Sequence, residues 1–535
     1  LTSAQIKSLS TDDLPSLAAE WITAIGDDTA ALTSLQLGVL VSDQVKALDV
    51  TKLLPTQIAK LGHAEAAAVP ADGDIPGTPA THDQIGALTE EQIAALTGDQ
   101  VKAITTAQLG ALTATQVPKI SADALPSMTA AQIGALSDVQ VGALDASTQI
   151  TVLTAGQVYG LKEAGINGLT TDQIAALTTD AVAAMTNAQL QAMTSQQIGA
   201  LKTAQIAAMT SGQMAALGTD QLAGLSSQQI GAIETRDLIA LTTAQMVALT
   251  AKQVQSLSNT QLAALTTTQV AAIEAADLAA LSPQQITNLT ATQITALTTS
   301  QLNGLKPNQV AALASDGIGG LSTAKIQAFD SSQLAALKSA QIQALTSNQL
   351  SAITTTNLQA LSASQISVLE TRDLAGFSTE QMSALTAKQV AALTASQLAQ
   401  LSTTQTSAID VADMSSIRQI SALSTQQISN LSTDQVAALS ADQVNKLSTS
   451  FSSLNGDQLA ALSSRQLQAI SFTQLASLSS SQVSALTTEQ VSNLRMSLVS
   501  AIGSTALAGL TTDQVGALTY TQVSQLSQSQ IGALT

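Results

Sequence analysis

An eight-residue repeat dominates the sequence and constrains the fold more than any other feature. From Leu201 the chain reads LKTAQIAA, MTSGQMAA, LGTDQLAG, LSSQQIGA, and it continues in this way. Each octad consists of Leu, Ser or Thr, two variable residues, Gln, then Ile, Val or Leu, a variable residue and usually Ala. The frame holds from Leu153 to Ile417, and the same spacing occurs from Leu88 to Leu144 and from Leu462 to Leu534. Such a short fixed period is the signature of a solenoid.

A period of eight residues excludes one continuous helix or one flat strand. At about 100° per residue, the Leu position would move by roughly 80° around a helix with each octad, so no apolar stripe would form. In a strand, the apolar positions one and six would point to opposite faces. The chain therefore has to bend once in every octad.

The residues within the octad indicate where a helix begins. Ser or Thr at position two and Gln at position five match the S/T-x-x-Q capping box, and the apolar positions one and six match the hydrophobic staple. Leu241-Thr242 through Gln245-Met246 is an example. Helices this short are unstable alone in water and need neighbouring octads to stack on. The sequence therefore predicts an all-α solenoid of very short helices, one per octad.

A β-solenoid with two or three octads per coil is the alternative, with Thr, Ile and Val in strands and Gln in stacked ladders. Ala, Leu and Gln favour helix, and strands are depleted in Ala. Turn residues such as Gly and Asn also do not recur at one position of the octad.

The composition excludes several classes of function. Hydrophobic residues make up 45% of the chain but aromatic residues only 1%, so the core has to be thin and built from Leu, Ile, Val and Ala. A net charge of −18 without a basic cluster argues against nucleic acid as a partner. No apolar run is long enough to predict a transmembrane segment. With two His and no Cys, we find no catalytic constellation and expect no enzyme.

Interruptions of the octads divide the chain into five predicted regions. These are irregular octads at 1–61, a loop rich in Pro, Gly and Asp at 62–83, the main solenoid at 84–447, an interruption at 448–461 and further octads at 462–535. The main solenoid contains a duplication, because Glu234-Thr-Arg-Asp-Leu238 recurs seventeen octads later, at Glu370 to Leu374. The array therefore grew by copying blocks.

The loop at 62–83 contains a candidate metal site. Asp72, Asp74 and Asp83 are spaced like acids one, three and twelve of an EF-hand loop, with Gly77 at position six. Pro76 at position five and Asp in place of the final Glu depart from that pattern. The loop is therefore either a Ca²⁺ site or a solvated acidic loop. Ca²⁺ is the only cofactor that the sequence suggests.

Four octads carry acids in place of the cap and the Gln. An acid near a helix N-terminus is favoured by the helix dipole, so these acids are explained as structural tuning. The alternative is a periodic contact site for calcium or for a neighbouring subunit. The acid pairs lie five octads apart within each block: Glu234 and Asp237, Glu274 and Asp277, Glu370 and Asp373, Asp410 and Asp413.

The L-T-x-x-Q-I-x-A octads resemble repeats of very large extracellular or surface proteins of Gram-negative bacteria, of the adhesin or filament kind. The resemblance covers nearly the whole chain and implies export and a structural or adhesive role, and attachment to the cell surface is a further expectation. It identifies no ligand. We expect a non-enzymatic filament, sheath or surface layer, and the alternatives are a stalk of a secreted adhesin and a scaffold that binds a ligand on its concave face.

The two ends of the sequence keep the repeat. Leu1-Thr2-Ser3-Ala4-Gln5-Ile6 opens in full consensus, and Leu534-Thr535 begins another octad. Soluble solenoids normally end in atypical polar repeats. We therefore expect each end to continue, either into further covalent repeats or into a second copy of the chain.

If Asp72, Asp74 and Asp83 form a calcium site, isothermal calorimetry on the chain should detect Ca²⁺ binding at millimolar concentration or below. Removing the second ligand with Asp74→Ala should abolish the heat. Absence of heat from the unsubstituted chain at millimolar Ca²⁺ would leave only the solvated-loop interpretation.

Overall fold

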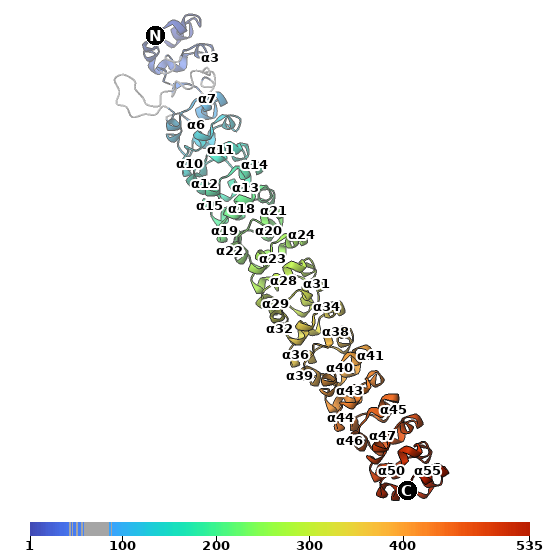
Figure 1. The fold of residues 1–535 in the computed structure, drawn as a ribbon. Helices are drawn as coiled ribbons and strands as arrows, with labels where there is room; N and C mark the ends of the chain where they lie inside the picture. The colour runs from blue at the N-terminus through green and yellow to red at the C-terminus, as the bar shows by residue number, and fades with distance from the viewer. Residues whose placement is uncertain are drawn as a thin grey trace. The chain divides into compact units, whose positions relative to one another are not determined.

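Very short helices make up all the regular structure in the described part of the chain. The computed structural model describes residues 1–41, 44, 47–49, 52–54, 57, 85–86 and 88–534. Its α-helices are four to six residues long, and no strand occurs among these residues. The prediction of an all-α solenoid is confirmed, and the β-solenoid alternative is wrong. The chain forms two compact units, Leu1–Ile273 and Glu274–Thr535, each of which is built in the same way (Figure 1).

The capping box sets the start of most helices. In α22 (Thr243–Val247), the N-cap Thr242 is extended and its hydroxyl accepts a hydrogen bond from the Gln245 backbone amide at 3.2 Å. Gln245 Oε1 accepts in turn from the Thr242 backbone amide at 2.8 Å. Leu241 and Met246, the two staple positions, are both buried. The interpretation of positions one, two, five and six of the octad is therefore confirmed.

Three octads make one coil of the solenoid. Each helix packs against the third helix that follows it: α14 (Thr179–Ala184) packs against α17 (Thr203–Ala208), and α15 (Asn187–Ala192) against α18 (Ser211–Ala216). The same rule holds in the second unit, where α37 (Ala363–Ser367) packs against α40 (Ala387–Ala392). Neighbouring helices of a stack are therefore three octads apart in the sequence.

The buried Gln of each octad links successive coils. Gln245 Nε2 donates to the backbone carbonyls of Met214 at 3.0 Å and Leu217 at 2.8 Å, 31 and 28 residues earlier. Both carbonyls lie at the C-terminal end of a helix in the preceding coil, where backbone acceptors are short of donors, and the Met214 carbonyl also accepts from the Leu217 backbone amide at 3.4 Å. The same bonds recur along both units, for example from Gln381 to the carbonyls of Leu350 and Ile353. We call this repeated set of side-chain bonds the glutamine ladder.

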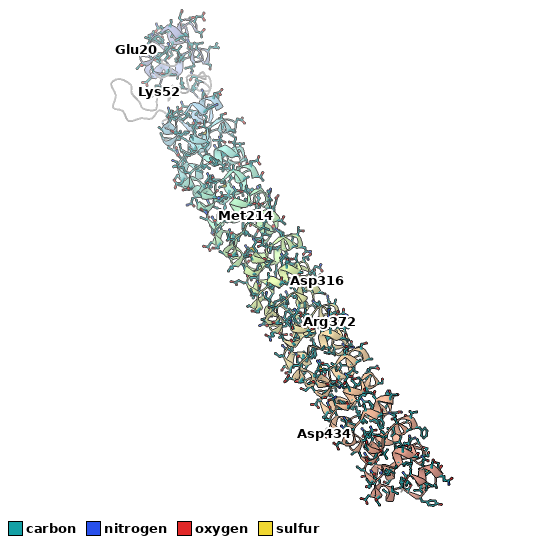
Figure 2. All side chains as sticks on the ribbon, viewed as in Figure 1. Glu20, Lys52, Met214, Asp316, Arg372 and Asp434 are labelled. Carbon is teal, nitrogen blue, oxygen red and sulfur yellow. The ribbon has the colours of Figure 1, made fainter. Side chains whose placement is uncertain are left out.

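The core of each unit is a narrow column of apolar side chains. Position six of the octad is almost completely buried, as for Ile198 and Val254, and the Leu at position one is nearly as well covered. Variable positions face the solvent. Among the residues labelled in Figure 2, Met214 is buried and the charged residues are exposed: Glu20, Lys52, Asp316, Arg372 and Asp434.

Repeats of unusual length are accommodated by 3₁₀ turns. The nine-residue repeat 144–152 ends in η7 (Ile150–Val152), and Asp145 accepts hydrogen bonds from the hydroxyls of Thr148 and Ser147 at 2.7 Å. These bonds, with the Thr148 backbone amide, lower the pKa of Asp145 to about 2. The seven-residue repeat 447–453 forms η10 (Ser448–Ser453), where Ser448 has a φ of 50°. The predicted boundaries of the five regions stay predictions.

The ladder predicts that Gln245→Glu is far more damaging than loss of a cap. The substitution keeps the acceptor for Thr242 but places a buried carboxylate against two carbonyls, at a cost of about 3 kcal/mol at pH 7. Thr242→Ala should cost about 1 kcal/mol. Hydrogen exchange of α22 in the full chain measures both local stabilities, and Leu241→Asp serves as a severe reference because it places a charge in the core. Equal effects of Gln245→Glu and Thr242→Ala would contradict the ladder.

Candidate functional site

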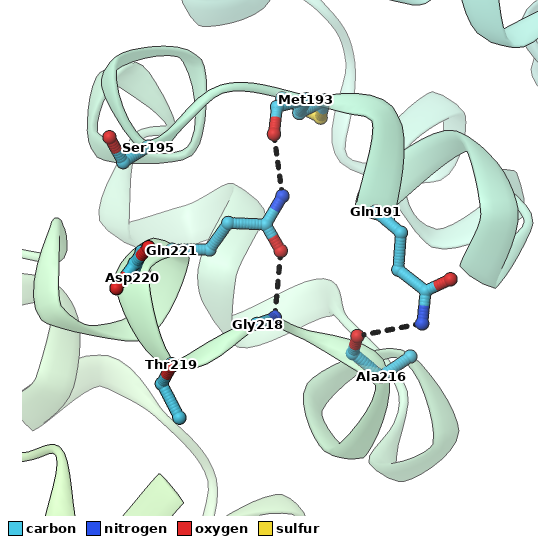
Figure 3. Close-up of a pocket in the computed structure, with 8 residues that line it drawn as sticks. All are labelled: Gln191, Met193, Ser195, Ala216, Gly218, Thr219, Asp220 and Gln221. Atoms are coloured by element: carbon cyan, nitrogen blue, oxygen red, sulfur yellow. Dashed lines mark hydrogen bonds between the residues drawn. The ribbon is translucent and has the colours of Figure 1, made fainter.

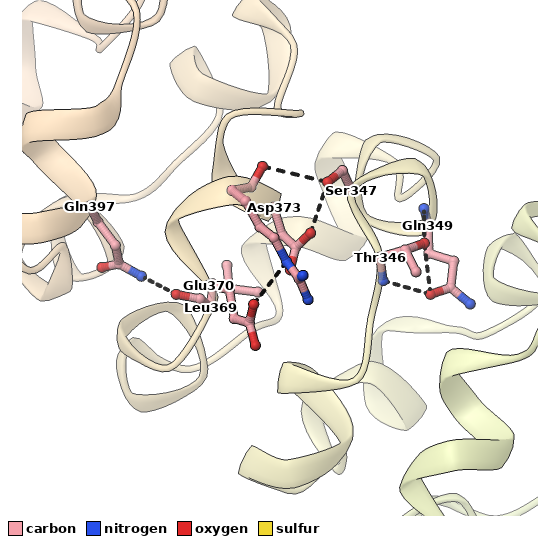
Figure 4. A network of polar contacts seen from close by, with 8 residues as sticks. Thr346, Ser347, Gln349, Leu369, Glu370, Asp373 and Gln397 are labelled. Atoms are coloured by element: carbon pink, nitrogen blue, oxygen red, sulfur yellow. Dashed lines mark hydrogen bonds and ion pairs between the residues drawn. The ribbon is translucent and has the colours of Figure 1, made fainter.

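The acidic octads depart most clearly from the repeat, and they form the candidate site. In the second unit, Glu370 is the N-cap of α38 (Thr371–Leu374), and Asp373 occupies the Gln position with only 3% of its surface exposed. Ser347 Oγ donates to Asp373 Oδ1 at 2.8 Å (Figure 4). Arg372 Nε lies 2.8 Å from Glu370 Oε2 and 3.6 Å from Asp373 Oδ2. Ser347 begins α35 (Ser347–Ser351), the helix on which α38 packs.

The first unit contains the same arrangement, seventeen octads earlier in the sequence. Ser211 Oγ donates to Asp237 Oδ1 at 2.6 Å, and Arg236 Nε lies 3.0 Å from Glu234 Oε2. Asp237 is 1% exposed. A buried carboxylate is costly unless it is paired and hydrogen-bonded, and Ser and Arg meet that need here. The duplicated segment therefore carries a complete structural unit and not only a sequence.

The other two acidic octads lack the Arg. Ala276 and Ala412 stand where Arg236 and Arg372 stand in the first pair. Burial raises the pKa of Asp277, and the nearby Glu274 raises it further. Burial likewise raises the pKa of Asp413, with a further contribution from the charge of Asp410 (the N-cap). Glu274 and Asp410 thus each lie beside a carboxyl group that no Arg of the same octad neutralises.

The geometry of these octads supports a structural role for their acids, which link neighbouring coils. In both Arg-containing octads the carboxylate at position five is already engaged by a hydroxyl and a guanidinium. Within the second unit, Glu370 and Asp410 are five octads apart, which is not a whole number of three-octad coils. They therefore do not form a single row along the solenoid. A contact role for the eight acids, with calcium or a neighbouring subunit, stays a prediction.

The described residues contain no group of three or more His, Asp or Glu side chains that could hold a metal ion. Asp72, Asp74 and Asp83 lie outside the described residues, so the candidate calcium loop stays a prediction as well.

Shallow hollows between coils are lined by residues of the repeat itself. In one hollow, Gln221 Nε2 donates to the Met193 carbonyl at 2.6 Å and Gln221 Oε1 accepts from the Gly218 amide at 2.8 Å (Figure 3). Gln191 Nε2 bridges to the Ala216 carbonyl at 3.1 Å. The side-chain amides that line this hollow are therefore used by hydrogen bonds of the solenoid itself.

Sequence reasoning singled out the acids but not their partners. In the sequence, Arg236 and Arg372 stand out only as part of the duplicated E-T-R-D segment. Ser211 and Ser347 each stand 26 residues before the Asp that they serve, and that spacing has meaning only once the coil is known to contain three octads. Asn357 follows the same rule, because it accepts from Ser331 Oγ at 2.7 Å.

The fold and the glutamine ladder define the protein as an α-helical repeat solenoid. The family described as "ALTTAQ repeat" matches eight segments that together cover more than half of the chain: 157–187, 182–211, 230–267, 270–307, 310–347, 366–403, 418–449 and 459–495. The chain belongs to the ALTTAQ repeat family.

Other comparisons add little. No curated protein matches the chain. A leucine-rich repeat protein, LegL7 from Legionella pneumophila, is 12% identical over 45% of this chain and 79% of its own, with a TM-score of 0.15. A homology model of the full-length AP-3 complex is 12% identical over 98% and 90%, with a TM-score of 0.17. The structure of APUM23-GGAAUUGACGG is 13% identical over 89% of this chain and 93% of its own, with a TM-score of 0.15. TM-scores this low do not show a shared fold.

In the part of the chain that is described, no helix has both the length and the apolar character needed to cross a bilayer.

The Ser347–Asp373 bond predicts a cost for a substitution that the repeat alone would tolerate. Ser347→Ala should destabilise the α35–α38 contact by about 2 kcal/mol, because it removes a donor from a buried carboxylate. Ser339→Ala is the matched control, since Ser339 occupies the same octad position and is exposed. Hydrogen exchange of α38 in the full chain measures the difference, and equal exchange in the two variants would refute a role for the bond.

Proposed function

We propose that this protein is a non-enzymatic structural repeat protein that builds an extracellular filament, sheath or surface layer through end-to-end or lateral association. The glutamine ladder carries the proposal. Each coil presents Gln amides to the coil before it and helix-end carbonyls to the coil after it, in the same pattern throughout. The two faces of any coil are therefore complementary, and a heterologous contact of this kind propagates when it does not close.

Exposed apolar side chains on α54 (Tyr520–Val523) and α55 (Gln528–Gly532) support association. Position six is buried throughout the interior, yet Val523 and Ile531 are 37% and 50% exposed. Exposed apolar surface of this kind favours contact with a complementary face.

The composition supports a location outside the cell. The chain has no Cys to be oxidised, and only 10% of its residues are charged, so its surface is dominated by Ser, Thr and Gln. The predicted resemblance to large secreted or surface proteins points the same way. A stalk that displays another domain is the alternative, and the hollow lined by Gln191 and Gln221, whose amides are already bonded to backbone, favours a spacer over a scaffold that binds a ligand.

Light scattering and electron microscopy of the purified 535-residue chain test the proposal. We expect the scattering mass to rise with concentration and fibres or sheets to form, in the presence or absence of Ca²⁺. Ile531→Asp should reduce end-to-end growth by charging the exposed apolar face, whereas Tyr520→Asp, at an 89% exposed position outside that face, should not. A monodisperse monomer at high concentration would contradict the building-block proposal and favour the stalk.

A further inference from the structure

Most octads have a hydrogen-bond donor at position five, although Gly165, Ala181 and Gly317 provide none. Gln supplies it in most octads, and two substitutes keep it. Lys325 Nζ donates to the Thr295 carbonyl of the preceding coil, and Asn357 Nδ2 donates to the Phe329 carbonyl at 3.1 Å. Phe329 lies 28 residues before Asn357, which is the spacing of the ladder. Gln, Lys and Asn share only the ability to donate from the end of the side chain.

Asp413 breaks this rule without a compensating partner. It occupies position five of η8 (Val411–Ser416), a helix that packs on α40 of the preceding coil. The expected acceptor for Asp413 in the glutamine ladder is the Leu385 carbonyl, because Leu385 precedes Asp413 by the same spacing as Phe329 precedes Asn357. Among the described residues, the Leu385 carbonyl has no hydrogen-bond donor and the Asp413 carboxyl has no hydrogen-bond partner. Leu385 is 2% exposed, and an unpaired buried carbonyl is costly.

Asn357 shows that a side chain of this length reaches the ladder acceptor. Asn and Asp have the same number of side-chain atoms, and Asn357 makes the bond from the same octad position. A protonated Asp carboxyl has the shape of the Asn amide and carries one O–H donor, whereas an ionised carboxylate can only accept. The protonation state of Asp413 therefore decides whether this octad can join the ladder.

We propose that Asp413 is a pH-operated clamp between two coils: its protonated carboxyl donates to the Leu385 carbonyl, and ionisation releases that bond. The clamp moves one proton between solvent and the carboxyl and needs no other reactant. The consensus Gln makes a permanent bond at this place, so the Asp converts a fixed contact into one that responds to acid.

The charges around Asp413 favour protonation as pH falls. Burial raises the pKa of Asp413, and the negative charge of Asp410 on the same helix adds to this effect. The charged residues of the packed helices are Lys388 on α40 and Asp434 on α44 (Thr433–Ala437), both exposed, and Arg418 follows η8. A carboxyl whose pKa is higher in the folded state stabilises the fold at low pH and loses this contribution as pH rises through the folded pKa.

The duplication provides a second example. Asp277 stands seventeen octads before Asp413, also beside an N-cap acid, and burial raises its pKa in the same direction. Asp237 and Asp373 do not qualify as clamps, because Ser and Arg already hold their carboxylates. Each copied block thus carries one permanently tied acid and one acid that is free to take up a proton.

Isosteric variants of the full chain test the clamp. Asp413→Asn carries a permanent donor, and Asp413→Leu has the same shape without a donor or a charge. Hydrogen–deuterium exchange of residues 409–417, corrected for the intrinsic effect of pH, reports local opening. At pH 7 we expect Asp413→Asn to be protected about five- to tenfold more than the unsubstituted chain, and the difference to vanish as the pH is lowered to 3. Asp434→Asn, which removes a nearby exposed charge, should leave the pH dependence of this segment unchanged.

Two outcomes would overturn the proposal. Equal protection of Asp413→Asn and Asp413→Leu at pH 7 would show that loss of charge, and not a donated hydrogen bond, stabilises the segment. A constant difference between Asp413→Asn and the unsubstituted chain from pH 7 to 3 would show that Asp413 does not act through its proton. If Asp413→Asn fails to fold, the titration of the Asp413 side-chain carboxyl carbon by nuclear magnetic resonance, with the protection of residues 409–417 in the unsubstituted chain, still decides the question: the two must change over the same pH range.

Discussion

The structure depends on the buried side-chain amide of the Gln in most octads, which accepts a hydrogen bond on one side and donates hydrogen bonds on the other. Within its own octad, the Gln side-chain oxygen holds the N-terminus of a helix, and across the coil interface the nitrogen of the same amide holds the C-terminal carbonyls of another. Helices of four to six residues have more unpaired backbone groups at their ends than hydrogen bonds within them. In most octads, one Gln side chain therefore satisfies backbone groups at the ends of two helices.

This double use explains why position five is Gln and so rarely Glu. The capping box accepts either residue, because both have an oxygen for the N-cap amide. Only Gln also donates, and at an interior position a Glu would bring a charge against backbone carbonyls. Four of the other residues at this position are informative for the same reason: Lys325 and Asn357 donate, and Asp237 and Asp373 accept from a Ser that the preceding coil provides.

The local structure could be predicted from the sequence, but the coil could not. Thr242 and Gln245 specify a helix start through contacts within one octad, and Leu241 and Met246 specify its buried face. The number of octads per coil depends on how helices from different octads fit together, and every octad presents nearly the same residues to its neighbours. Ser211 and Asp237 are therefore ordinary residues in the sequence until the coil places them 2.6 Å apart. In the sequence, only the preference for Gln over Glu at position five indicates that this side chain forms a hydrogen bond other than the one in the capping box.

The three-octad coil also determines how such a molecule responds to tension. No strand pairs or long helices tie distant parts of a unit together among the described residues, because every ladder bond joins residues of adjacent coils. A force applied to the two ends would open the outermost coil first and leave the coils behind it intact. Each step would release three octads, or about 80 Å of extended chain. A unit of this kind would unfold one coil at a time. It would therefore lengthen under load in small steps and dissipate energy at each step.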